Sequence, residues 1–383
     1  MSDPKPAQPL PPARDKLLFT PGPLTTSATV KQAMLTDLGS RDETFLRVVR
    51  EVRERLLSIY GLSQAAGHEA VLVQGSGTFA VESVLSSMMP RDGKLLVCVN
   101  GAYGERIVKM AGVHGIPCEV LRAREDTPID PTAVGAALAR DPALTHVALV
   151  HVETTSGVLN PMRAVGEVVH AAGRSYFVDA MSAFGALPIE FDAGHVDFLA
   201  ASSNKCLEGI PGLAFVLARR SALERLEGRA RTLALDLHAQ WRGFEKDGQF
   251  RFTPPTHVVL ALHRALHELE LEGGVAGRER RYRANHARLR AGMEALGFRA
   301  YVPAAASSPI ISTFLYPAHP RFDFQAFYRA LSARGFLIYP GKLTQADCFR
   351  LGNIGRLFEG DIEALLAAVP LVLRDLGVEL GRG

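Results

Sequence analysis

The sequence is poor in cysteine and has no long apolar run, and each scarcity excludes a class of protein. Four cysteines occur among 383 residues. Their spacings are typical of neither a zinc site nor a disulfide framework, and they are Cys98, Cys118, Cys206 and Cys348. We therefore expect a reduced, cytoplasmic location. Because no run of about 18 apolar residues is present, the sequence predicts no membrane span.

The chain also lacks an excess of charge of either sign. Its 43 Lys and Arg residues against 40 Asp and Glu residues leave a formal net charge of +3. This balance argues against a nucleic-acid-binding protein and suits small anionic substrates better. A hydrophobic share of 47% is enough for a large core and excludes a disordered chain.

Short apolar runs alternate with helix-like segments through the first two thirds of the chain. Most of the runs are continuously apolar, as in parallel strands that helices cover on both faces. The expected strands are 70–74, 95–99, 119–121, 146–152, 176–178, 197–201 and 213–217, and the expected helices are 79–89, 103–114, 132–140 and 162–172. The pattern predicts an α/β fold around a mostly parallel sheet of seven strands.

The two ends of the chain differ from this central part. Residues 1–16 are polar and proline-rich, without the apolar segment of a signal peptide, and we expect a flexible tail there. After residue 253 the chain is first helical and then forms shorter elements. The expected strands there are 310–315, 336–339 and 348–351, and the expected helices are 324–333 and 361–376. We therefore expect a large domain over 17–270 and a small α+β domain over 271–383.

Lys205 and Asp179 form the most informative pair in the sequence. Each directly follows an expected strand, and ligands of α/β sheets bind at the carboxyl ends of strands. A lysine in an apolar turn loses its proton more readily and can react with a carbonyl group. A carboxylate at the neighbouring strand end can hold a protonated pyridine nitrogen. The pair therefore points to pyridoxal phosphate chemistry.

Other strand ends carry residues that suit the same cofactor. Ser76, Gly77 and Thr78 lie between a strand and a helix, where backbone N–H groups bind phosphate. Tyr103 could stack on a flat ring, and a hydroxyl in the segment 153–157 could bind a phenolic oxygen. Each of these features alone is equally compatible with an ordinary turn or loop.

Arg350 ends an apolar strand candidate in the C-terminal part of the chain. A guanidinium group so placed can bind a carboxylate or a phosphonate through two parallel hydrogen bonds. A structural ion pair is an equally good interpretation of this residue from the sequence alone.

Nine segments spread over residues 17–376 resemble the class V aminotransferases of fold type I. They are LLFTPGPLTTSATVKQAML (17–35), VQGSGTFAVES (73–83), VNGAYGERI (99–107), HVETTSGVLNP (151–161), VDAMSAFGALPI (178–189), SSNKCLEGIPGLAFVLA (202–218), LDLHAQW (235–241), FRFTPPTHVVLAL (250–262) and FRLGNIG (349–355). Three of them, LDLHAQW, FTPPTH and NKCLEGIPG, resemble the branch of this class that acts on aminophosphonates.

The resemblance implies pyridoxal 5'-phosphate as the cofactor and gives a role to each matching position. Lys205 would hold the cofactor covalently and Asp179 would bind its pyridine nitrogen. The remaining cofactor contacts would be Ser76, Gly77 and Thr78 at the phosphate, Tyr103 and Met181 on the two ring faces, Thr154 at the ring oxygen, and Thr253 at the phosphate in the neighbouring subunit. The working unit would then be a homodimer with shared active sites.

The resemblance also implies the substrates. Arg350 would bind the acidic group, residues 17–30 would line the entrance, and the amino group of 2-aminoethylphosphonate would pass to pyruvate. Two features depart from the aminophosphonate pattern, namely residues 39–43, which also resemble alanine– and serine–glyoxylate enzymes, and His238, where tyrosine is common. A class V transaminase using alanine or serine with glyoxylate or pyruvate is therefore the alternative.

Other classes of function are less well supported by the residues. A dinucleotide-dependent oxidoreductase would need a G-x-G-x-x-G segment after a strand, and none is present. A binding protein on an α/β scaffold and a lyase that uses the same cofactor stay open at this point.

Overall fold

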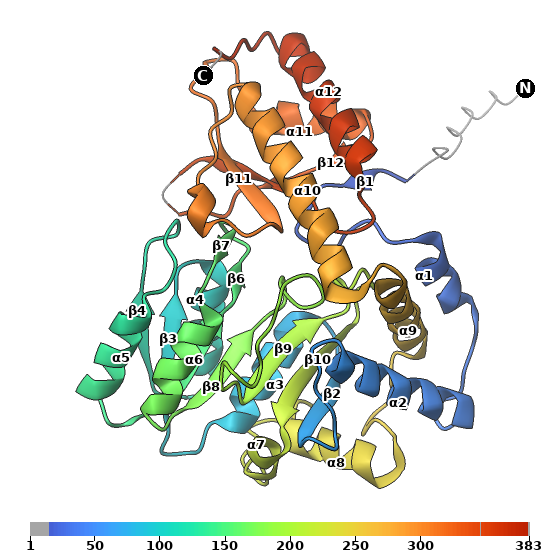
Figure 1. Ribbon diagram of the computed structural model, residues 1–383, viewed down its shortest axis with the longest axis vertical. Coiled ribbons are helices and arrows are strands. Elements are labelled where there is room, and N and C mark those ends of the chain that lie inside the picture. Colours follow the sequence, from blue (N-terminus) through green and yellow to red (C-terminus); the bar gives the residue numbers. More distant parts are fainter. Residues whose placement is uncertain (1–14, 345, 382–383) are drawn as a thin grey trace, which may run out of the picture.

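The computed structural model describes residues 15–344 and 346–381. The expected N-terminal tail therefore lies almost wholly outside the described residues. The described chain forms a sheet covered by helices and a smaller group of elements beside it, and helix α10 (Gly274–Ala295) runs from one to the other (Figure 1).

The large sheet has seven strands in the order β2-β10-β9-β8-β5-β3-β4. Their bounds are His68–Gln74 (β2), Lys94–Val99 (β3), Cys118–Arg122 (β4), Leu144–Val150 (β5), Ser175–Asp179 (β8), Phe198–Ser202 (β9) and Leu213–Arg219 (β10). Strand β10 pairs antiparallel with both of its neighbours, and the other pairs are parallel. The predicted α/β fold with a mostly parallel sheet of seven strands is confirmed. All strands except β10 end at the same edge.

Helices cover both faces of this sheet and bury its apolar strands. Their starts follow local capping rules: the Asp42 and Asp130 side chains accept hydrogen bonds from first-turn backbone N–H groups, and Pro131 stands at the first helical position. The bounds are Ala28–Gln32 (α1), Glu43–Ser58 (α2), Gly77–Met88 (α3), Ala102–Val113 (α4), Pro131–Arg140 (α5), Met162–Ala171 (α6), Arg220–Glu224 (α7), Leu237–Asp247 (α8) and Thr256–Leu271 (α9), with a 3₁₀ turn at Ala33–Leu35 and a short hairpin of β6 (Val152–Glu153) and β7 (Val158–Leu159).

The smaller group of elements has its own apolar core. Phe298, Phe314, Phe327 and Phe349 are buried in it, and the rings of Phe298 and Phe349 meet edge to face at 5.5 Å. Its elements are a 3₁₀ turn at Ala304–Ala306, β11 (Ile311–Leu315), α11 (Phe324–Ala333), β12 (Phe336–Leu337), β13 (Tyr339–Pro340), β14 (Cys348–Gly352) and α12 (Glu359–Asp375). The domain boundary near residue 270 stays a prediction.

The expected strand 336–339 is divided in the structure. Its first part, β12, pairs in parallel with β1 (Leu17–Leu18) from the start of the chain, and its second part, β13, pairs antiparallel with β14. The two parts serve different partners, so a single straight strand could not satisfy both. As a result, the first described residues of the chain are tied to the C-terminal group.

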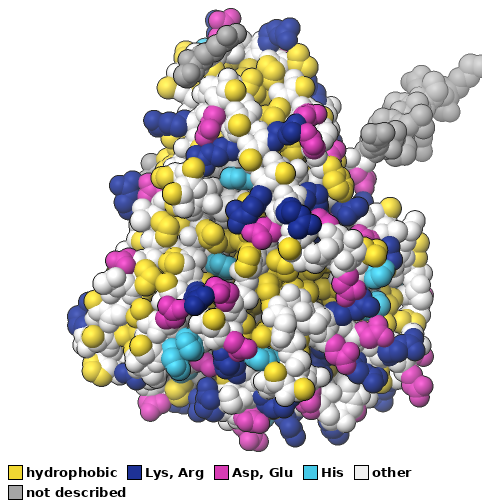
Figure 2. All heavy atoms as spheres, in the orientation of Figure 1, with side chains coloured by type: hydrophobic (Ala, Val, Ile, Leu, Met, Phe, Trp, Pro, Cys, Tyr) yellow, Lys and Arg dark blue, Asp and Glu magenta, His cyan; other side chains and the backbone are white. Residues whose placement is uncertain are grey.

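No helix in the described ranges is both long and apolar enough to cross a membrane. Positive and negative side chains are interspersed over the face seen in Figure 2, in line with the balanced composition. All four cysteines are free thiols, and the cytoplasmic location stays a prediction.

Glycine at position 166 allows α6 to lie close to the segment after residue 190. A Cβ at Gly166 would lie 1.9 Å from the carbonyl oxygen of Gly194, which is backbone and cannot rotate away. We expect Gly166→Ala to lower the free energy of unfolding by about 2 kcal/mol or more, because the helix must shift.

Gly112→Ala is the matched control, since Gly112 is exposed in α4 and a Cβ there meets nothing within 4 Å. This variant should gain about 0.5–1 kcal/mol from helix propensity. Urea unfolding of both variants measures the difference, and equal midpoints would contradict the steric explanation.

Candidate active site

Five strand ends converge on one cavity. Strands β2, β3, β5, β8 and β9 end at the same edge of the sheet, and the order of connections reverses at β3, whose neighbours are β4 and β5. Such a reversal leaves a crevice at the carboxyl ends of the strands. A cavity of about 180 Å³ lies there. Its lining includes Gly22, Ser76, Gly77, Thr78, Tyr103, Arg106, Thr154, Asp179, Met181, Ser182, Ser202, Asn204 and Lys205.

Lys205 follows β9 and extends toward the N-terminal segment. Its Nζ donates a hydrogen bond to the carbonyl oxygen of Pro21 at 2.5 Å. Gly22 passes so close that a Cβ there would lie 2.6 Å from the Cδ of Lys205. Burial lowers the pKa of this amine, although Tyr103 and Asp179 favour its charged form. The neutral, nucleophilic amine is therefore more accessible here than in water.

Asp179 ends β8 and faces the same cavity. Its Oδ1 accepts a hydrogen bond from the backbone N–H of Met181 at 2.9 Å. Burial raises the pKa of this carboxyl to about 6, while the charges of Lys205 and Arg106 oppose the shift. A cation placed beside Asp179 would stabilise the carboxylate that burial disfavours.

The N-terminus of α3 forms another wall of the cavity. Ser76 precedes the helix and makes no side-chain hydrogen bond to its first turn. The N–H of Phe79 donates to the carbonyl of Ser76, whereas the N–H groups of Gly77 and Thr78 can be offered to a ligand. Arg106 adds positive charge, since its Nη1 donates to the Thr78 hydroxyl at 3.1 Å. A Cβ at Gly77 would lie 2.4 Å from the sulfur of Met181, so a larger residue at this position would require the Met181 side chain to move. The arrangement is suited to bind a phosphate group.

Tyr103, Thr154 and Arg350 form a cluster on the side of β3 and β5. The Tyr103 hydroxyl is influenced by its neighbours Thr154 and Arg350. Burial raises the pKa of Tyr103, but the charge of Lys205 and the polar Thr154 side chain outweigh it, and the net shift is downward. Arg350 Nη1 donates to the carbonyl of Thr154 at 2.8 Å, and its Nε donates to that of Pro340 at 3.0 Å. Arg350 is not among the residues that line the cavity, but these two carbonyls hold it beside Tyr103 and Thr154, which do line it.

A buried carboxylate holds the turn that carries Tyr103. The oxygen atoms of Glu153 accept hydrogen bonds from the backbone N–H groups of Tyr103 at 3.2 Å and Thr155 at 3.0 Å. The Thr155 hydroxyl in turn accepts a hydrogen bond from the backbone of Ala102. Glu153 thus fixes the ends of β3 and β5 relative to each other.

A second buried network holds the turn that carries Lys205. Arg278 of α10 donates from Nη1 to the carbonyl of Cys206 at 2.7 Å. Glu208, three residues after the lysine, accepts hydrogen bonds from Arg281 at 2.6 Å and from the hydroxyl of Tyr282 at 2.7 Å. Helix α10 therefore sets the position of the turn after Lys205.

The structure brings together most of the residues singled out in the sequence, but not all of them. Thr253 lies outside the cavity and is exposed, with its carbonyl accepting a hydrogen bond from Gln74 at 2.6 Å. Neither residues 39–43 nor His238 line this cavity. The roles given to all of these residues stay predictions.

Two residues near the site were missed. Arg106 could have been found, because it follows Tyr103 by three positions and therefore shares its helix face. Lys342, whose Nζ lies 5.7 Å from the Tyr103 ring centroid, comes from a segment far from the strand ends and gave no local signal. Pro21 belongs to the expected entrance segment 17–30, but its hydrogen bond to Lys205 was not foreseen.

Comparisons with known proteins agree with this geometry. The family described as "Aminotransferase class-V" matches residues 27–343. A 2-aminoethylphosphonate–pyruvate transaminase from Klebsiella pneumoniae subsp. pneumoniae is 50% identical over 93% of this chain and 97% of its own length.

Solved structures share the fold. A ureidoglycine–glyoxylate aminotransferase from Bacillus subtilis has a TM-score of 0.88 at 22% identity, with 98% of this chain and 97% of that chain covered. An alanine–glyoxylate aminotransferase from Nostoc sp. has a TM-score of 0.87 at 26% identity, with 96% and 98% covered.

The raised pKa of Asp179 predicts a pH-dependent stability. Between pH 3.8 and about 6 the folded protein binds a proton that the unfolded chain has lost, so stability falls as the pH rises through this range. Asp179→Asn has no ionisable group at this position, so the variant does not lose stability in this way as the pH rises. In protein free of bound ligand, the variant should exceed the wild type in free energy of unfolding by up to about 3 kcal/mol at pH 7. Urea titrations at pH 4 and pH 7 test this, and an equal gap at both pH values would contradict it.

Proposed function

The chain belongs to the class-V aminotransferase family, and from this premise we propose that it transfers the amino group of 2-aminoethylphosphonate to pyruvate with pyridoxal 5'-phosphate as cofactor. The products are phosphonoacetaldehyde and L-alanine. The observation that carries the proposal is that Lys205 and Asp179 face one cavity beside an uncapped helix N-terminus. The identity of 50% to a transaminase of that name supports the choice of substrates.

The residues of the cavity fit the cofactor. The first turn of α3, with Ser76, Gly77 and Thr78, offers N–H groups to the phosphate, and Arg106 offers a positive charge. Asp179 offers a carboxylate to the protonated ring nitrogen. Tyr103, Met181 and Thr154 line the same cavity, and in this proposal the first two contact the ring and Thr154 binds its oxygen.

Pyridoxal phosphate, when bound, supplies an aldehyde that condenses with amines and a ring that accepts an electron pair from the adjacent carbon. Lys205 would hold the cofactor covalently through its Nζ. When free, this Nζ, whose pKa burial lowers, would accept a proton from the donor carbon and would serve as the proton donor afterwards. Asp179 keeps the ring nitrogen protonated, and Glu153 keeps Tyr103 in position.

Arg350 binds the acidic group of the donor and of the acceptor in turn. Arg350 is 1% exposed, and its Nε and Nη1 donate to two backbone carbonyls, so that Nη2 would serve to bind a phosphonate or a carboxylate. Lys342 lies near the same end of the pocket and adds a second positive charge, which a doubly charged phosphonate uses better than a carboxylate does.

The working unit in this proposal is a homodimer. Phe79 and Phe252 are exposed by 49% and 47%, and Leu233 by 74%. Both phenylalanines line a cavity of about 620 Å³ next to the start of α3. Exposed apolar groups of this size are typical of an interface. Thr253, exposed beside Phe252, would then reach the cofactor phosphate of the partner.

Lys205→Ala should abolish transamination and the visible absorption of the purified protein, because the covalent link to the cofactor needs this amine. Lys109→Ala is the control, since Lys109 is exposed on α4. Absorption spectra after addition of pyridoxal phosphate measure the outcome. A visible band retained in Lys205→Ala would show that another lysine holds the cofactor.

A screen of amino donors tests the substrates. The enzyme should convert 2-aminoethylphosphonate and pyruvate faster than alanine or serine with glyoxylate, as measured by NMR of the products. Faster turnover of alanine or serine with glyoxylate would favour the alternative donor class.

Arg350→Gln should raise KM for both 2-aminoethylphosphonate and pyruvate by about tenfold to a hundredfold, because charge-assisted hydrogen bonds to each are lost. The exposed Arg374 provides the control variant Arg374→Gln.

A further inference from the structure

A second, larger cavity lies at the opposite edge of the large sheet. Its volume is about 850 Å³, within the range of small-molecule sites. His146 at the start of β5 and Ser175 at the start of β8 line it, together with Arg219 at the end of the antiparallel β10. Because β8 carries Ser175 at this end and Asp179 at the other, about 13 Å of strand separate the two cavities.

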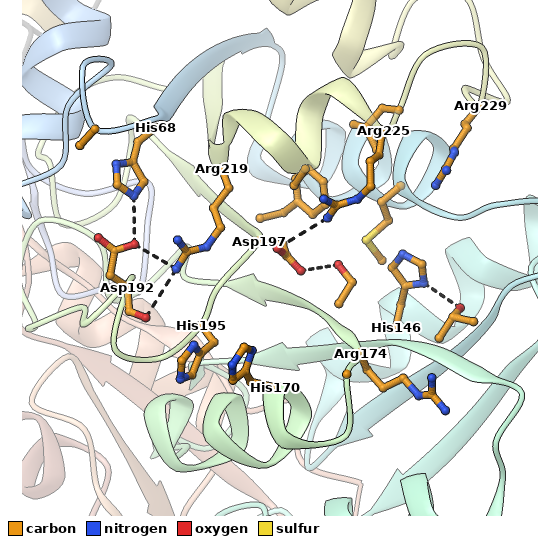
Figure 3. Close-up of a pocket in the computed structure, with 18 residues that line it drawn as sticks. His68, His146, His170, Arg174, Asp192, His195, Asp197, Arg219, Arg225 and Arg229 are labelled. Carbon is orange, nitrogen blue, oxygen red and sulfur yellow. Dashed lines mark hydrogen bonds and ion pairs between the residues drawn. The ribbon is translucent and has the colours of Figure 1, made fainter.

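In one half of this cavity, the lining side chains interact with one another. Asp192 pairs with His68 at 3.0 Å and with Arg219 at 2.9 Å. The rings of His170 and His195 stack on each other with centroids 3.8 Å apart (Figure 3). These groups leave little unsatisfied charge on this side.

The other half is lined by three arginines and a histidine. Figure 3 shows Arg225 and Arg229 on one side and His146 and Arg174 on the other. Burial lowers the pKa of His146 to about 4, and the charges of Arg229 and Arg225 act in the same direction, so these guanidinium groups lie close to the imidazole. The imidazole is therefore neutral, and the positive charge here comes from the arginines.

The arginines of this half are poorly compensated. Within the described ranges, Arg174 donates from Nη2 to the carbonyl of Pro142, and its Nε is buried without a hydrogen-bond partner. Neither Arg174 nor Arg229 forms an ion pair with another described residue. Arg225 lies 3.9 Å from Asp197. That carboxylate already accepts hydrogen bonds from the Ser175 hydroxyl at 2.5 Å and from a backbone N–H.

The balance of the whole lining favours an anion over a metal ion. Four arginines against two aspartates leave two positive charges in excess. The four histidines of the cavity do not gather with other groups into a metal-binding cluster in the part of the chain that the structure describes. Arginine forks match the oxygens of phosphate groups.

We propose that the half of this cavity formed by Arg174, Arg225, Arg229 and His146 binds a small molecule that carries phosphate groups. A small ligand fits better than an extended polyanion, because the positive groups line a cavity that Asp192 and Asp197 also line. The site is separate from the active site, and it does not depend on which amine the enzyme uses.

Titration calorimetry of the holoenzyme with inorganic pyrophosphate, and with inorganic phosphate for comparison, tests the proposal. We expect one saturable site per chain, unaffected by saturating 2-aminoethylphosphonate. Arg229→Gln and Arg174→Gln, which alter opposite walls, should each weaken pyrophosphate binding at least tenfold. Arg124→Gln is the matched control, since Arg124 is exposed and pairs with Asp126 two positions along the chain, outside this cavity.

The transamination rate of the variants verifies that they are folded, because the altered residues lie at the far edge of the sheet. Absence of saturable binding would overturn the proposal. So would displacement of pyrophosphate by 2-aminoethylphosphonate, which would place the ion in the active site, or an equal loss of binding in Arg124→Gln.

Discussion

Burial of the Lys205 amine beside the Asp179 carboxylate is the constraint on which the rest of the site depends. Removing both groups from water shifts the pKa of the amine down and that of the carboxyl up, so each charged form is disfavoured. A ligand that takes the amine into a covalent bond and brings a cationic nitrogen to the carboxylate relieves both penalties together. The pocket therefore favours binding of such a ligand before any substrate arrives.

This constraint needs rigid support, and two buried networks provide it. Glu153 fixes the turn of Tyr103, while Arg278 and Glu208 fix the turn that follows Lys205. Buried charges are costly unless they are paired and fully hydrogen-bonded, and their pairing here ties α10 to the sheet edge. The Tyr103 side of the pocket is thus held by Glu153, within the sheet, and the Lys205 side is held by helix α10, which leads to the smaller group.

The sequence was informative where function coincides with a strand end. Strands β8 and β9 are continuous apolar runs, so the positions of Asp179 and Lys205 followed from hydrophobicity and from the geometry of parallel sheets. Pro21 could not be predicted as a partner of Lys205, because their contact spans 184 residues and depends on the pairing of β1 with β12. The arginine-lined cavity gave no motif either, since its residues come from the starts and ends of separate elements.

The pairing of the first described strand with a late one has a consequence for synthesis on the ribosome. Leu17 pairs with Phe336, and the backbone of Gly352 donates to the carbonyl of Phe19. The segment that contacts Lys205 can therefore reach its place only after the residues up to 352 have emerged. A nascent chain can assemble the large sheet earlier, but Lys205 stays uncovered until those later residues have been made.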